Sequence, residues 1–213
     1  MRPLILTQSL NLSLSLSGSE EFVDLRPVLM ALRHNSYFTG VSLIGLPRRE
    51  VISVLGDVLR YNTALEVVEM PEIDAKDGLV EFGEALVFNA AAKLFELDFS
   101  RNPLRSHVFG LTNAFCQISM PLRKLHLRDC SIPAKSMNQL VHALAENPAF
   151  CVSITDLDLG GNDLSMALSS NALSALLGNI SQVPLLEALG FANSNIMYGS
   201  RSLSLSLSLA LSH

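Results

Sequence analysis

The chain has 213 residues, of which 49% are hydrophobic and 16% are charged, and its formal net charge is −5. Such a composition is too apolar for a disordered chain, so we expect a buried core. The acidic balance argues against general binding to nucleic acid and against a polybasic membrane anchor. No apolar run of about 18 residues is present, so no direct membrane insertion is expected.

The cysteines argue for a cytoplasmic protein. The number of cysteines is odd, and their spacing is not that of a metal site: they are Cys116, Cys130 and Cys151. We therefore predict reduced thiols in the core rather than disulfides or zinc ligands.

Both ends of the chain are rich in alternating leucine and serine. Strict alternation is compatible with a β-strand. These tracts carry no turn signals, however, so we predict low-complexity segments without a packed partner over residues 1–19 and 198–213. If exposed, such uncharged segments would be prone to β-aggregation.

The central part of the chain contains a repeated motif. Residues 122–132 and 154–164 both follow the pattern L-x-x-L-x-L-x-x-(N/C)-x-L, which is the signature of a leucine-rich repeat. Related copies begin near residues 38, 65, 94, 122, 154 and 186. A period of roughly 30 residues leaves room for a helix after each strand. Residues 20–197 therefore predict an α/β fold: a horseshoe of the ribonuclease-inhibitor-like type with about six repeats, a parallel inner sheet and outer helices.

The ninth position of the motif carries the residue that stabilises the turn. Asn102 and Asn162 can bond the backbone of the adjacent turn through their side-chain amides, whereas Cys130 can do so only weakly. The corresponding positions 46, 73 and 194 carry Leu, Ile and Ser. We expect the turn to be less well specified there.

A central row of outward-facing side chains follows from the alternation along each strand. The predicted row is Ser42, Glu69, Asp98, His126, Asp158 and Gly190. Neighbouring parallel strands lie about 4.8 Å apart, which places His126 between Asp98 and Asp158 and predicts a raised pKa for His126. The row is either a catalytic or metal-binding cluster or a solvated polar row. We favour the second, because no nucleophile–base set or metal geometry is complete, and we expect no enzyme, cofactor or metal.

Charges alternate between the strands of the predicted concave face. The candidate partner-binding residues are Glu66, Glu69, Glu72, Asp98, Arg123, Lys124, His126, Arg128, Asp156 and Asp158. Alternating charge suits the recognition of a charged protein surface. Ordinary solubilising charge is the competing interpretation.

Three tracts resemble the CARMIL family, the leucine-rich-repeat linkers that regulate actin capping protein. Residues 24–39 are similar to the family's first helix and entry strand, and residues 97–104 (LDFSRNPL) to its recurring L-x-L-S-x-N-P-L repeat. Residues 136–162 resemble a later pair of repeats. The resemblance covers residues 21–197.

The resemblance implies a longer horseshoe between a membrane-binding pleckstrin-homology-like domain and a helical dimerisation region, followed by a tail that binds capping protein. We expect none of these neighbours in the chain, so capping-protein inhibition is not carried over. What it implies is a scaffold for actin filament assembly and cell migration, associated with the cytoskeleton at the leading edge of the plasma membrane. The alternative is a sensing or inhibitory repeat module, as in immune receptors.

Overall fold

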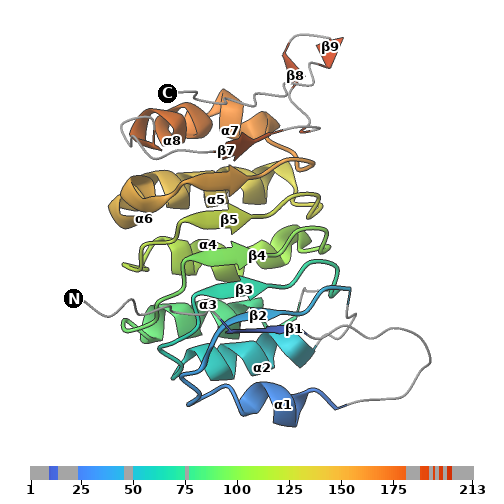
Figure 1. Cartoon of the computed structure of the whole chain (residues 1–213). Helices are drawn as coiled ribbons and strands as arrows, with labels where there is room; N and C mark the ends of the chain where they lie inside the picture. The colour runs from blue at the N-terminus through green and yellow to red at the C-terminus, as the bar shows by residue number, and fades with distance from the viewer. Residues whose placement is uncertain are drawn as a thin grey trace.

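A computed structural model describes residues 10–13, 24–45, 50–74, 77–180, 188–191, 194, 197–198 and 201–202. Seven parallel strands form one sheet in chain order, and helices cover one side of it (Figure 1). The strands are β1 (Leu10–Ser13), β2 (Phe38–Ser42), β3 (Val67–Glu69), β4 (Glu96–Asp98), β5 (Lys124–His126), β6 (Asp156–Asp158) and β7 (Ala188–Gly190). The predicted α/β solenoid of leucine-rich repeats is thus confirmed.

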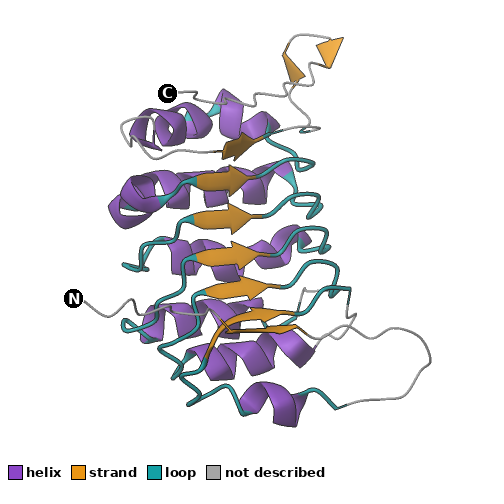
Figure 2. Ribbon diagram, in the orientation of Figure 1, coloured by secondary structure: helices purple, strands orange, loops and turns teal. Residues whose placement is uncertain are grey.

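The helices alternate with the strands along the chain (Figure 2). They are α1 (Arg26–Met30), α2 (Glu50–Leu59), α3 (Leu79–Phe88), the 3₁₀ helix η1 (Arg105–Val108), α4 (Phe109–Phe115), α5 (Ala134–Glu146), α6 (Pro148–Ser153), α7 (Ser165–Ser169) and α8 (Ala172–Ile180). Within the described residues, none of them has the length and apolarity needed to cross a membrane.

The second leucine of each repeat forms the centre of the sheet. The parallel register aligns Val41, Val68, Leu97, Leu125, Leu157 and Leu189 as neighbours across β2–β7. All of these side chains are buried on the helical side of the sheet. Because side chains alternate along a strand, the residues on either side of this row point outward.

Apolar stripes on the helices complete one continuous hydrophobic core from Leu25 to Phe191. Phe82 of α3 and Phe99, just after β4, meet edge to face with ring centroids 5.4 Å apart, which links neighbouring repeats. In α1 the side chain of Leu29 is buried, whereas that of Val28 is 40% exposed. The short helix α1 packs against α2.

Asparagines hold the turns that follow the strands. The Asn102 amide donates to the carbonyls of Met70 and Phe99, both at 2.7 Å, and its Oδ1 accepts the N–H of Ile73. This bond supports the turn at Ile73, whose own apolar side chain cannot. Asn162, one repeat after Cys130, makes the same kinds of bond. The Cys130 thiol donates to the Phe99 carbonyl at 3.2 Å. That the thiol supports its turn less well than an amide stays a prediction, and position 46 lies outside the described residues.

A second series of asparagines, which the sequence interpretation missed, lies on the side of the solenoid where the strands begin. Asn62, Asn89 and Asn147 each end a helical segment and donate to carbonyls of the preceding repeat. Asn89, for example, bonds the carbonyl of Leu59, and Asn147 bonds that of Phe115. Leu59 and Phe115 are the last residues of α2 and α4, and the carbonyls at the end of a helix have no partner within the helix.

The segments at the two ends differ from the expectation where the structure describes them. Residues 10–13 form β1, which pairs in parallel with β2 and packs Leu12 against the core. The reason is that the alternation of leucine and serine places one apolar face on the open edge of β2. β8 (Met197–Tyr198) and β9 (Arg201–Ser202) form a small antiparallel ladder. The remainder of 1–19 and 198–213 lies outside the described residues.

The three cysteines do not all lie in the core. Cys130 and Cys151 are buried free thiols, as predicted, but Cys116 is exposed. Cys116 directly follows the last residue of α4, where the chain turns on the outside of the solenoid.

Candidate protein-interaction face

The outward side of the sheet, called the strand face below, consists of two rows of residues from β2–β7. The first row is Gly40, Val67, Glu96, Lys124, Asp156 and Ala188, and the second is Ser42, Glu69, Asp98, His126, Asp158 and Gly190. The second row is the predicted central row, and its register is confirmed. The charged residues of these two rows therefore lie on strands with fixed spacing.

The register places His126 between Asp98 and Asp158, as predicted. Its side chain, however, contacts Asp156 and not Asp158. Its Nε2 is 3.0 Å from Oδ2 of Asp156, and its Nδ1 is 3.9 Å from Oδ2 of Asp98. The Asp158 carboxylate instead accepts the Gly160 N–H at 2.8 Å and faces Arg128 at 3.4 Å, which turns it away toward the end of the strand.

These contacts change the protonation of the cluster. The carboxylates of Asp98 and Asp156 together raise the pKa of His126 to about 9 against the effect of burial, which lowers it. Burial alone would raise the pKa of Asp98, but the nearby His126 and the hydrogen bond from Ser100 lower it below its usual value. The predicted raised pKa of His126 is confirmed. At neutral pH the cluster is a cation flanked by carboxylates.

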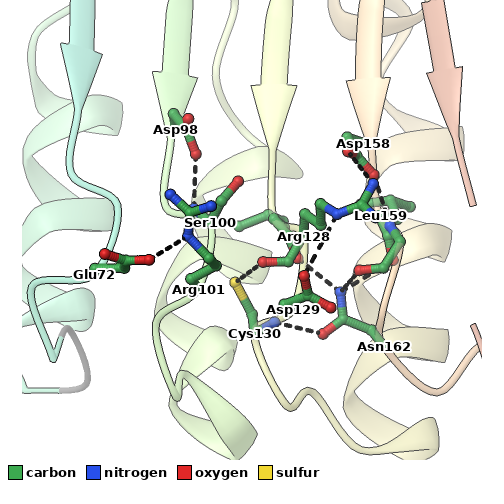
Figure 3. A network of polar contacts seen from close by, with 12 residues as sticks. Glu72, Asp98, Ser100, Arg101, Arg128, Asp129, Cys130, Asp158, Leu159 and Asn162 are labelled. Carbon is green, nitrogen blue, oxygen red and sulfur yellow. Dashed lines mark hydrogen bonds and ion pairs between the residues drawn. The ribbon is translucent and has the colours of Figure 1, made fainter. Parts of the chain in front are cut away.

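The other cations of the β5 repeat are paired in the same way. Lys124 Nζ lies 3.2 Å from Glu96 Oε1 on β4. Arg128 contacts Asp158 and Asp129, each at 3.4 Å, as Figure 3 shows. The β5 repeat is therefore a basic strip held between acidic repeats.

The remaining predicted residues lie at the edges of the strand face. Glu66 and Arg123 precede β3 and β5, and the Arg123 guanidinium stacks 4.8 Å from the ring centroid of Phe95. Glu69 lies in the central row, while Glu72 lies beyond the opposite ends of the strands, 2.6 Å from Arg101 (Figure 3). The structure thus brings together the charges of β4, β5 and β6, with Arg123 beside Lys124 and Glu96 where the strands begin, and it places Glu66 and Glu72 at the edges of the face.

Three charged residues of this face were missed from the sequence: Glu96, Arg101 and Asp129. Glu96 stands two residues before Asp98, as Lys124 stands before His126 and Asp156 before Asp158. Arg101 and Asp129 each follow their strand by three residues and have left-handed φ values of 60° and 54°. The repeat frame would have found all three if every outward position had been read.

A depression of about 590 Å³ opens at the edge of the strand face where β4–β6 begin. Arg123, Lys124 and Glu96 lie on its polar side, and Val152, which is 66% exposed, lies on its apolar side. Such a notch suits a single partner side chain with an apolar stem and a charged end. Among the described residues, no group of three or more His, Cys, Asp or Glu side chains has the arrangement of a metal site.

Comparison with known proteins supports the fold. No family model matches the chain. It is 24% identical over 179 residues to the Rho GTPase-activating protein gacW of Dictyostelium discoideum, and the match spans 83% of the chain but only 16% of that protein.

Two solved structures are similar in fold. One is leiomodin-1 actin-binding site 2, with a TM-score of 0.57 and 16% identity, covering 77% of this chain and 94% of that one. The other is the tropomodulin C-terminal domain of Caenorhabditis elegans, with a TM-score of 0.57 and 15% identity, covering 75% and 95%. At this identity the likeness shows the leucine-rich-repeat fold alone.

Proposed function

We propose that the chain is a non-enzymatic protein-binding module of a CARMIL-like scaffold, and that its strand face docks a component of the actin filament machinery. The observation that carries the proposal is the basic β5 strip between acidic repeats, fixed in register by the sheet. A rigid pattern of alternating charge selects a partner with the complementary pattern and steers its approach.

The actin machinery is proposed on three grounds. The tracts at residues 24–39, 97–104 and 136–162 resemble CARMIL repeats. One protein of similar fold is an actin-binding site of leiomodin-1, and the relative at 24% identity is a Rho GTPase-activating protein. On this proposal the intact protein works in the cytoplasm with the cytoskeleton.

A binding role suits the chemistry of the strand face better than catalysis. The cations of β5 are engaged by carboxylates at 3.0–3.4 Å, which holds their side chains in place. A partner can exchange these contacts for its own with little loss of side-chain freedom, because the side chains are already ordered.

Co-sedimentation with actin filaments, and anisotropy with labelled actin monomers, test the proposal. We expect binding that weakens with salt and falls at least about tenfold in the double variant Arg123→Glu/Arg128→Glu. Lys135→Glu, an exposed position on α5, is the matched charge reversal away from the strand face and should bind as the unaltered chain does. If the chain binds neither actin filaments nor actin monomers, the proposal is contradicted. An equal loss of affinity in Lys135→Glu also contradicts it.

A further inference from the structure

The helical side of the solenoid carries a groove that is separate from the strand face. It runs between α3 and α4 and has a volume of about 450 Å³. Residues of one face of each helix line it, among them Val80, Glu84 and Val87 of α3 and Asn113 of α4. A second hollow of about 510 Å³ continues it toward the starts of both helices and shares Val80 and Gly110 with it.

Two glycines form the floor of the groove. Gly83 of α3 and Gly110 of α4 are buried, and a Cβ on Gly83 would overlap the carbonyl oxygen of Gly110. A Cβ on Gly110 would in turn overlap the carbonyl of Leu79. The two helices therefore approach backbone to backbone, and at these two positions the floor of the groove carries no side chain.

The walls of the groove are apolar although they face outward. Val80, Val87 and Phe88 of the groove are 51%, 36% and 62% exposed, and Phe109 of the second hollow is 54% exposed. A run of large apolar side chains along two adjacent helices marks an interaction site more often than chance exposure does. Phe88 is fixed at one end, because Arg60 stacks 5.1 Å from its ring centroid and Tyr61 meets its edge at 6.4 Å.

The rim of the groove and of the second hollow carries three exposed carboxylates. Glu84 lines the groove, and Asp77 and Glu81 line the second hollow together with His107. Arg60, the lining cation at the Phe88 end, is already 4.0 Å from Glu84. An occupant that matches both features needs an apolar stripe for the floor and positive charges for the rim.

We propose that the groove between α3 and α4 docks a basic amphipathic helix of a protein partner. The apolar side chains of that helix lie over Gly83 and Gly110, and its lysines or arginines face Asp77, Glu81 and Glu84. α3 has ten residues, which is a length of about 15 Å, so about three turns of the partner helix make contact. The site lies on the helical side of the sheet and is independent of the strand-face proposal.

A second copy of the chain fits the groove less well. Glu84 stands at the middle of α3. If two copies packed with their α3 helices antiparallel, this carboxylate would face its own counterpart at the centre of the contact. A basic helix turns the same carboxylate into a favourable contact.

Fluorescein-labelled synthetic helices of about 14 residues test the site by anisotropy, since the chain has no tryptophan of its own. The probe has leucines at i, i+3, i+4 and i+7 and lysines beside them. One control peptide replaces the lysines by glutamate, and another replaces the leucines by serine. We expect the first peptide to bind and both controls to bind at least about tenfold more weakly.

Variants of the chain locate the binding. Val87→Ser/Phe88→Ser and Glu81→Lys/Glu84→Lys should each lower the affinity of the probe at least about tenfold. Val152→Ser removes an exposed valine elsewhere, and Glu66→Lys/Glu69→Lys makes the same charge change on the strand face. Both controls should bind the probe within about twofold of the unaltered chain, and circular dichroism melting confirms that each variant is folded.

Three results would overturn the proposal. The first is probe binding that the groove variants leave unchanged. The second is an equal loss in the strand-face control, which would indicate general attraction to an acidic protein. The third is a dimer in sedimentation velocity that Val87→Ser/Phe88→Ser dissociates, which would make a second copy the occupant.

Discussion

The β5 repeat differs from the β4 and β6 repeats on either side of it in charge and in the residue that supports its turn. β4 and β6 carry carboxylates and are followed by Asn102 and Asn162, whereas β5 carries Lys124 and His126 and is followed by Cys130. Its neighbours compensate for both differences. Carboxylates from both sides hold its cations, and the Asn162 amide holds its turn.

This support is directional. Asn162 Oδ1 accepts the N–H groups of Cys130 and Ile132, so the β5 turn is secured from the β6 side. Toward β4 the Cys130 thiol offers a weaker contact to the Phe99 carbonyl. In a solenoid, stability is transmitted through contacts between adjacent repeats, so the contact between β4 and β5 is the weaker of the two.

The largest effect is expected for Asn162→Ala. Its side chain is buried and bonds Leu127 O at 2.7 Å and the N–H groups of Cys130 and Ile132, so its loss leaves buried backbone groups unpaired. We expect the free energy of unfolding to fall by about 2–4 kcal/mol. Urea unfolding measures this, with the exposed Asn113→Ala as the control. A loss below about 1 kcal/mol would mean that water replaces the amide.

His126→Gln should remove a pH dependence of stability. The pKa of His126 is raised to about 9 in the folded state, from about 6.5 in an unfolded chain, so the folded state binds the proton more tightly. The stabilisation is complete below pH about 6.5 and is lost as the pH rises through about 9.

Because the His126 side chain is 30% exposed, we expect its pairing to add about 1–2 kcal/mol to the free energy of unfolding at pH about 6.5. Urea unfolding of the unaltered chain and of His126→Gln between these pH values measures it, with the exposed His142→Gln as the control. Parallel pH profiles for the unaltered chain and His126→Gln would contradict the pairing with Asp98 and Asp156.

Cys130→Asn should make the β5 repeat more like its neighbours. The pocket already presents the Phe99 carbonyl to the Cys130 thiol, and the backbone N–H groups of Asn102 and Arg101 face the sulfur. An amide would bond both kinds of group, as Asn102 and Asn162 do, and we expect a gain of about 1 kcal/mol. Cys130→Ala should lower stability by a similar amount. A loss of stability in both Cys130→Asn and Cys130→Ala on urea unfolding would show that the pocket is too small for the amide.

The repeat frame predicted what depends on the backbone and failed where side-chain choices decide. The strands, the buried leucine row and the outward row follow from a period of two residues, which the sheet enforces. The choice of Asp156 over Asp158 as the partner of His126 depends on the Gly160 N–H, which turns Asp158 away. The groove between α3 and α4 depends on Gly83 and Gly110, which come from different repeats, so neither repeat alone indicates it.

The smallest effect is expected for Lys124→Met, which tests whether the charges of β5 serve stability or recognition. The Lys124 and Glu96 side chains are 40% and 34% exposed, and their contact of 3.2 Å is open to solvent. A surface pair of this kind contributes less than about 0.5 kcal/mol, so the urea midpoint should scarcely move. The methionine keeps the apolar stem, and any loss of partner affinity in this variant therefore reports the charge itself. A loss of stability above about 1 kcal/mol would instead show that the pair between β4 and β5 compensates for the weak support of the Cys130 turn.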